Sequence, residues 1–190
     1  LGLLNSFQAV SLANNHIRDY GDKGCHDTLA ALDERGIGHF GMGVTQDAAL
    51  TPKIIEKNGI RVAFLGATRY ANARRCYGTA PDSLRRLQKI IRNLKKEGCF
   101  VVPYFHWGYE YVRIPSPRER KIAQGCINAG ADLVVGSHPH IYQAVEKYKE
   151  RMIFYSLGSV IFSSSERASR GPHDGGLGGG VVVAVGGVVG

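Results

Sequence analysis

Short apolar runs alternate along the chain with segments in which apolar residues recur every three or four positions. The runs predict β-strands, and the recurring positions predict amphipathic helices. Strands are expected at 9–13, 53–55, 60–65, 99–105, 132–136, 143–146 and 152–162, and helices at 22–35, at 84–94 and from 117 to the glycine at 130. Because strands and helices alternate, the pattern predicts an α/β fold.

Local signals sharpen two of these elements. Asn58-Gly59 separates two predicted strands and is the strongest short hairpin signal, so 53–55 and 60–65 should pair antiparallel. Ser116-Pro117-Arg118-Glu119 combines a capping box with proline at the first helical position and should begin a helix. The added hairpins imply a mixed sheet or two packed sheets.

Three predicted strands lead directly into segments that contain histidine. The segments are Asn14-Asn15-His16, His106-Trp107-Gly108 and Gly136-Ser137-His138-Pro139-His140. In an open α/β sheet, ligands bind at the carboxyl ends of the strands, so the three segments should converge. Neutral imidazole is a common ligand of transition metals, and a carboxamide oxygen can complete the shell. The pattern therefore predicts a metal site.

The alternative for any single histidine is that it caps a loop or lies in the core. Three strand ends that each deliver a ligand-type side chain are hard to obtain by chance from 7 histidines. His26, His39 and His173 lack this context, and we expect them to have no role in the site.

The composition fits one globular domain with a substantial core, since 44% of the 190 residues are hydrophobic. The formal net charge of +8 favours polyanions, whether nucleic acid, anionic lipid or an acidic polymer. Basic residues cluster at 85–96, where the charged face of the predicted helix is expected to be solvated. No zinc-finger, RNA-recognition or phosphate-loop pattern accompanies them, which argues against a dedicated nucleic-acid module.

The cysteines and the ends of the chain exclude further classes. Cys25, Cys76, Cys99 and Cys126 form no C-x-x-C pair, which argues against a cysteine-ligated zinc site, and Cys99 and Cys126 should be core residues. No apolar run reaches transmembrane length. No basic-then-apolar leader occurs at Leu1, and the abrupt start suggests that the sequence begins inside a domain.

The end of the chain is rich in glycine and valine. We expect the domain to span 1–165 and assign no function to the tail at 166–190, which permits one short strand at 181–185.

Five stretches together resemble the CapA family of bacterial capsule synthesis proteins, the PGA_cap domain, which is associated with poly-γ-glutamate and related to calcineurin-like metallophosphoesterases. They are Ser11-Leu12-Ala13-Asn14-Asn15-His16 with Asp19-Tyr20-Gly21, then Ala63-Phe64-Leu65-Gly66, then His106-Trp107-Gly108-Tyr109-Glu110-Tyr111, then Gly136-Ser137-His138-Pro139-His140 with Gln143, and Tyr155-Ser156-Leu157-Gly158. The similarity spans about 5–165, and the order and spacing of the motifs make it specific.

The resemblance implies a metallophosphoesterase-like sandwich of mixed β-sheets flanked by helices, and it implies roles for individual residues. Asn15, His106, His138 and His140 would ligate divalent transition metals, zinc, manganese or iron, with two ions in a complete domain. His16 would protonate the leaving group as a catalytic acid. Glu110 would hydrogen-bond a ligand histidine or bind substrate, or else it is an ordinary exposed carboxylate. Tyr109 and Tyr111 are expected to pack the loop.

Two features depart from the family pattern. The early Gly-Asp and Asn-Leu-Glu motifs, which should precede Asn15 and supply a bridging carboxylate, have no match. Ser159 stands where the family has asparagine after Tyr-Ser-Leu-Gly. Either the first strand is missing from this sequence or the chain is a degenerate member of the family.

The leading hypothesis is a metal-dependent hydrolase-like domain that acts in synthesis, release or export of an anionic capsule polymer such as poly-γ-glutamate. The alternatives are a non-catalytic polymer-binding scaffold of a capsule-export complex and a nucleotide phosphodiesterase. The resemblance implies a cell-surface location, an upstream membrane anchor and other capsule-synthesis membrane proteins as partners.

Overall fold

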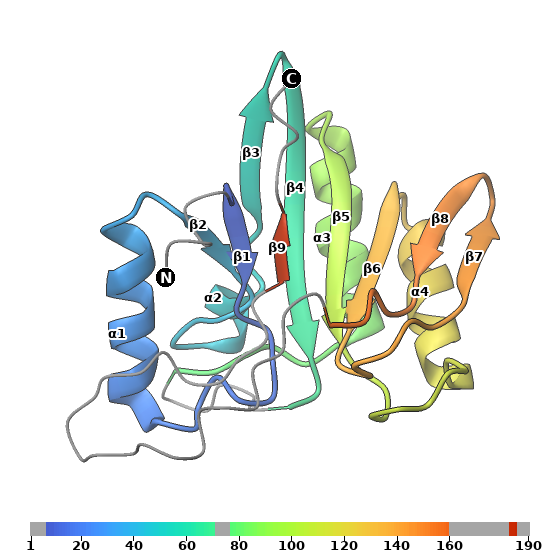
Figure 1. The fold of residues 1–190 in the computed structure, drawn as a ribbon. Coiled ribbons are helices and arrows are strands. Elements are labelled where there is room, and N and C mark those ends of the chain that lie inside the picture. The colour runs from blue at the N-terminus through green and yellow to red at the C-terminus, as the bar shows by residue number, and fades with distance from the viewer. Residues whose placement is uncertain (1–6, 71–76, 160–182, 186–190) are drawn as a thin grey trace.

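The computed structural model describes residues 7–70, 77–159 and 183–185, which form two sheets and their covering helices (Figure 1). The larger sheet has the strand order β3-β4-β5-β6-β8-β7, and the smaller has the order β2-β1-β9. The strands of the larger sheet are β3 (Lys53–Lys57), β4 (Ile60–Thr68), β5 (Phe100–His106), β6 (Leu133–Ser137), β7 (Val145–Tyr148) and β8 (Arg151–Phe154), and those of the smaller sheet are β1 (Ala9–Ser11), β2 (Gly38–Phe40) and β9 (Val183–Val185). Both sheets are mixed, which confirms the predicted fold class.

The central strands of the larger sheet are parallel and end together. β4 pairs with β5 and β5 with β6 in parallel, and the register places Thr68 beside His106 and His106 beside Ser137. The carboxyl ends of these strands therefore form one edge of the sheet. β3 joins β4 through the predicted hairpin, in which Asn58 and Gly59 have φ angles of 52° and 75°. Positive φ at both positions is what a two-residue hairpin turn requires.

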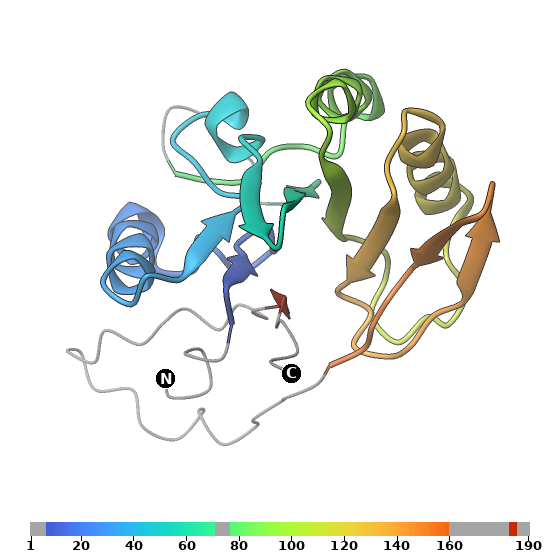
Figure 2. The ribbon, with the colours of Figure 1, turned by 90° about the horizontal axis from the view of Figure 1, so that it is seen from above.

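Helices cover the outer face of the larger sheet, while the smaller sheet packs on its other face. Figure 2 shows α2 (Gln46–Ala49), α3 (Leu84–Lys96) and α4 (Pro117–Asn128) on one side. Between the sheets, the rings of Phe40 and Phe64 stack with centroids 5.7 Å apart. α1 (Gly21–Asp33) covers the smaller sheet, where Cys25 lies in a separate apolar cluster.

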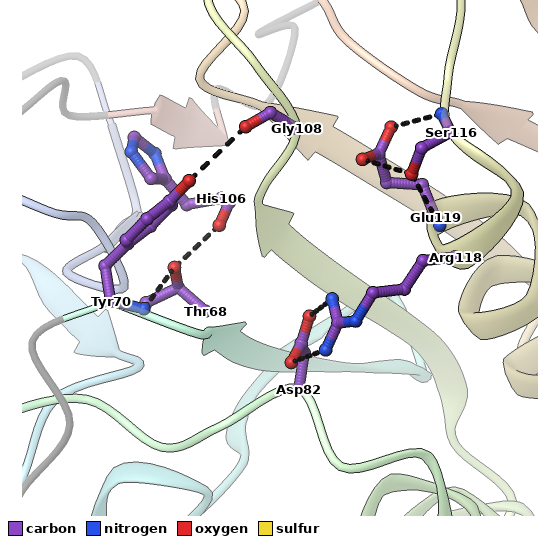
Figure 3. Close-up of polar contacts among 8 residues, drawn as sticks. All are labelled: Thr68, Tyr70, Asp82, His106, Gly108, Ser116, Arg118 and Glu119. Carbon is purple, nitrogen blue, oxygen red and sulfur yellow. Dashed lines mark hydrogen bonds and ion pairs between the residues drawn. The ribbon is translucent and has the colours of Figure 1, made fainter.

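The beginning of α4 confirms the predicted capping box. The Ser116 backbone N–H donates to Glu119 Oε2 at 2.9 Å, and Ser116 Oγ accepts from the Glu119 N–H at 3.3 Å. Next to it, Arg118 forms two hydrogen bonds of 2.6 and 2.7 Å with the buried carboxylate of Asp82 (Figure 3). The pair connects α4 to the segment that leads into α3, because Asp82 lies two residues before that helix.

Some boundaries differ from the predicted ones. The last predicted strand, 152–162, ends as β8 at Phe154, and the chain then makes only an isolated bridge between Tyr142 and Leu157. β2 and α2 were not predicted, because three and four residues are too few to show a period. A strand in the tail is confirmed at β9, while the rest of 166–190, His173 and Cys76 lie outside the described residues.

Two further expectations can be compared with the structure. Cys99 and Cys126 are buried in the main core, as predicted, and neither they nor Cys25 form a disulfide among the described residues. No helix in the described part of the chain is long and apolar enough to cross a membrane.

Candidate metal centre

The four predicted ligands converge at the carboxyl edge of the sheets. Asn15 follows β1, His106 is the last residue of β5, and His138 and His140 follow β6. Asn15 Oδ1 lies 2.9 Å from His106 Nε2. The ring centroids of His106 and His138 are 4.5 Å apart, and those of His138 and His140 are 6.2 Å apart. Side chains that are up to 125 positions apart in sequence thus form one cluster.

His106 is the most rigidly placed member of this cluster. It is only 2% exposed, and its carbonyl oxygen accepts a hydrogen bond of 2.6 Å from Thr68 Oγ1 (Figure 3). Its Nδ1 lies 3.3 Å from Ser137 Oγ. Tyr70 places its ring edge against His106 and donates from its hydroxyl to the Gly108 carbonyl at 3.3 Å. Neighbouring strands therefore fix the ring before any ligand binds.

Sequence reasoning did not identify Thr68 and Tyr70. Thr68 is the partner of His106 in the strand register, and the Tyr70 ring also lies 5.4 Å from that of His138. Both residues follow the apolar run of β4 as the histidines follow theirs. That shared position was the available signal, but β4 carries no metal-ligand side chain there.

The electrostatics of the cluster keep the buried histidines neutral. Burial, and then the nearby His138, His16 and His140, lower the pKa of His106 to about 3. Burial also lowers the pKa of His138, and the carboxylate of Glu110 acts in the opposite direction. At neutral pH both rings therefore carry free nitrogen lone pairs, which is the state that binds a metal ion.

Glu110 joins this cluster from the loop after β5. One ligand atom each of Glu110, His138 and His140 lie within 4.8 Å of one another, and Glu110 Oε1 is 3.9 Å from His140 Nε2. The Tyr111 backbone N–H donates to the Pro139 carbonyl at 2.8 Å, which ties the Glu110 loop to the residue between the two histidines. The carboxylate is thus held beside both imidazoles.

The backbone around these residues is strained. Tyr111, His138 and His140 have φ angles of 61°, 100° and 62°, in the left-handed region that residues with side chains rarely occupy. Such conformations persist where surrounding contacts enforce them, and they cluster at binding and catalytic sites.

Ser159 orients His140 from the other side. Its Oγ lies 3.0 Å from His140 Nδ1, which leaves Nε2 directed to Glu110. Ser159, where the family pattern has asparagine, thus keeps a polar contact to the second histidine of the pair. In metal sites, such outer contacts fix the ring and its tautomer.

The two tyrosines beside Glu110 do not behave as predicted. Tyr109 and Tyr111 are 65% and 67% exposed, so the prediction that both pack the loop is wrong. The Tyr111 ring instead stacks on that of His140, with centroids 5.9 Å apart. The aromatic side chains of this loop therefore face water beside the histidine pair.

His16 stands at the rim of the cluster. Its Nδ1 lies 2.8 Å from Asp19 Oδ2, both side chains are about half exposed, and its backbone N–H donates to Asn14 Oδ1. A carboxylate at Nδ1 fixes the tautomer and orientation of an imidazole, as a catalytic acid requires. His26 and His39, by contrast, pair with surface carboxylates outside the cluster.

These donors fit a divalent transition metal. Imidazole nitrogens with a carboxamide and a carboxylate oxygen form the mixed set that zinc, manganese and iron accept, whereas calcium prefers oxygen alone. Sequence reasoning therefore predicted the four residues that the structure brings together as candidate ligands, while the folded structure showed how close Glu110 lies to two of them.

Comparison with known proteins places the whole cluster within one matched region. Residues 5–164 match the family described as bacterial capsule synthesis protein PGA_cap. The chain belongs to this family.

Relatives in the PGA_cap family share the same stretch. The capsule biosynthesis protein CapA of Bacillus anthracis is 37% identical over 165 residues, which cover 82% of this chain and 40% of that protein. The PGA biosynthesis protein CapA of Bacillus subtilis is 34% identical over 171 residues, 87% of this chain and 45% of that one. A probable polyglutamine synthesis accessory protein of Mycobacterium tuberculosis is 28% identical over 167 residues, 80% of this chain and 44% of that one. The chain therefore spans less than half the length of these relatives.

The serine at position 159, where the PGA_cap family pattern has asparagine, leads to a testable prediction. Ser159→Ala should weaken metal binding about tenfold, because His140 loses the contact that orients its ring. Titration calorimetry with Zn²⁺ or Mn²⁺ measures the change, and Ser159→Asn should retain affinity within about threefold. Ser163→Ala, another serine in the matched region, is the control. Unchanged affinity in Ser159→Ala would show that the contact does not position His140.

Proposed function

We propose that this chain is a metal-dependent hydrolase-like domain of a capsule synthesis protein, acting on an anionic polymer such as poly-γ-glutamate during its synthesis, release or export. The observation that carries the proposal is the convergence of Asn15, His106, His138 and His140 from three strand ends on one edge. The names of the relatives, which refer to capsule, PGA and polyglutamine synthesis, support the polymer and a role in the capsule. The proposal also includes a location at the cell surface, an upstream membrane anchor and other capsule-synthesis membrane proteins as partners, which the family resemblance implies.

In this proposal the four ligands hold a zinc, manganese or iron ion together with Glu110. The sequence analysis left Glu110 as a substrate contact or as a partner of a ligand histidine. Its approach to both His138 and His140 favours a direct carboxylate ligand, in a sequence that has no counterpart of the family's early aspartate. The half-exposed Glu110 also marks the side from which substrate enters.

A metal ion bound there would polarise a phosphoryl or acyl oxygen and lower the pKa of a bound water. His16 would deliver the proton that the leaving group needs from Nε2, since its Nδ1 faces Asp19. Its half-exposed position lets it reach a substrate at the open side of the site. Thr68 and Tyr70 keep the His106 loop in place while the substrate binds.

Metal removal tests the proposal. The chain, together with any residues that precede Leu1 in its gene, is loaded with Mn²⁺ or Zn²⁺ and assayed on poly-γ-glutamate and on bis(p-nitrophenyl) phosphate. Chelation should abolish cleavage, and added metal should restore it, while thermal unfolding confirms that the apoprotein stays folded. Cleavage that survives chelation would refute a metal-dependent hydrolase. Polymer binding without any cleavage would support the scaffold instead, and cleavage confined to the phosphodiester would support the nucleotide phosphodiesterase.

A further inference from the structure

The helix α3 carries most of the excess positive charge of the chain. Its 13 residues include six of the 24 basic residues and no acidic residue, while the whole chain has a formal charge of +8. The basic residues of α3 are Arg85, Arg86, Lys89, Arg92, Lys95 and Lys96. The net charge is therefore concentrated on one element rather than spread over the surface.

The two faces of α3 have opposite character. Leu87, Ile91 and Leu94 are buried in the main core, so the helix is firmly fixed on the sheet. The outer face presents an exposed stripe of four cations, which we call the α3 stripe: Arg85, Lys89, Arg92 and Lys96. These positions are spaced by four, three and four residues and share one side of a helix. At about 1.5 Å per residue the stripe is about 16 Å long.

Other basic side chains near the stripe have acidic partners, but those of the stripe do not. Arg86 pairs with Asp47, and Lys95 Nζ lies 2.6 Å from the buried Asp132. None of the four stripe residues forms an ion pair with any residue in 7–70, 77–159 or 183–185. Their charges are thus available to an external anion.

The like charges of the stripe oppose the stability of its own helix, although Lys96 in the last turn has the sign that the helix dipole favours. Arg85 lies in the first turn, where the helix dipole favours acidic residues, and α3 has no acidic residue there. Arg85 and Lys89, and likewise Arg92 and Lys96, place like charges four residues apart, an arrangement that destabilises helices. A bound polyanion would remove both unfavourable interactions.

The beginning of α3 lies at the same edge of the sheet as the candidate metal centre. Thr68, which contacts His106, donates its backbone N–H to the carbonyl of Ala80 at 3.0 Å, and α3 begins four residues later. The helix then runs back along β5 to the opposite edge (Figure 1). The stripe therefore leads away from the site across the outer face of the molecule.

We propose that the α3 stripe is a binding track for a linear polyanion with regularly spaced carboxylates, which it holds with one end toward the metal centre. The choice of a carboxylate polymer rests on the proposed function. The apolar residues of α3 all pack against the core, so the helix has none left to insert into a membrane. The helix contains no aromatic residue on which nucleic-acid bases stack.

Charge-matched variants test the track. The stripe variant replaces Arg85, Lys89, Arg92 and Lys96 by glutamine. The control variant replaces Lys23, Lys57, Lys147 and Lys149, four exposed lysines on other elements, in the same way. Fluorescence anisotropy with labelled poly-γ-glutamate is measured from about 20 mM to about 500 mM salt. The stripe variant should bind at least about tenfold more weakly at low salt and lose most of its salt dependence, whereas the control should change less than about threefold.

Further measurements distinguish the occupants. Equal losses in the two variants would show that only net charge matters and would overturn the track. Stripe-dependent binding that is tighter for a single-stranded oligonucleotide of matched charge, or for vesicles of phosphatidylglycerol, would overturn the carboxylate polymer as occupant. The stripe variant should keep its metal content and unfold at no lower temperature than the parent. Failure of the track would therefore leave the proposed metal chemistry untouched.

Discussion

His138→Ala is expected to remove most of the bound metal and with it all metal-dependent cleavage. His138 lies between His106 and His140, with ring centroids 4.5 and 6.2 Å away, and beside Glu110. Removal of the His138 ring therefore disrupts the contact with His106 as well as the group that contains His140 and Glu110. We expect affinity for Zn²⁺ or Mn²⁺ to fall by at least about a hundredfold, more than the loss caused by an outer contact.

Elemental analysis after equilibration with a defined metal concentration measures this loss. His26→Ala is the matched control, because His26 is an exposed histidine of α1 that pairs only with Asp27 in the described structure. The metal content of Glu110→Gln should lie between those of His138→Ala and His26→Ala. The amide keeps one oxygen that can bind the metal but loses the negative charge. Equal metal content in His138→Ala and the parent would eliminate the site, and an unaffected Glu110→Gln would return Glu110 to a substrate contact.

The second large effect concerns the adjacent residues Asn15 and His16, whose replacement should have different consequences. Asn15→Ala should lower metal occupancy, because Asn15 Oδ1 points at His106 Nε2 from 2.9 Å. His16→Ala should leave occupancy intact and slow turnover about a hundredfold to ten-thousandfold, the usual contribution of a positioned proton donor. His16 is directed by Asp19 and lies at the rim, so it can serve the leaving group without ligating the metal.

Two substrates separate these roles. Metal content is measured for each variant, and single-turnover rates are compared for a substrate with a poor leaving group and one with a good leaving group. With the good leaving group, which needs no proton, His16→Ala should recover much of its lost rate. If the His16→Ala protein loses its metal, His16 is a metal ligand and not the general acid. Equal turnover with both substrates would likewise reject the general-acid role.

The sequence predicted the carboxyl ends of β5 and β6 to within one residue because the apolar runs and the turn signals are local. The hairpin at Asn58-Gly59, the capping box at Ser116 and the helices on either side of β5 all depend on residues close together in the chain. The convergence of Asn15, His106, His138 and His140 was predictable for the same reason, since parallel strands bring the residues at their carboxyl ends to one edge. The short elements β2 and α2 were not predicted from the sequence because they contain too few residues to show a period.

The family, the type of fold and the four residues predicted as metal ligands were determined by the sequence alone, because each resides in a local pattern or a motif. Only the tertiary structure decided how Glu110, Ser159 and Tyr70 relate to them, since these contacts join loops far apart in the chain. The tertiary structure also decided which basic side chains of α3 have no acidic partner among the described residues. Arg86 and Arg85 are neighbours of the same charge, but folding brings Asp47 to the first and leaves the second facing water.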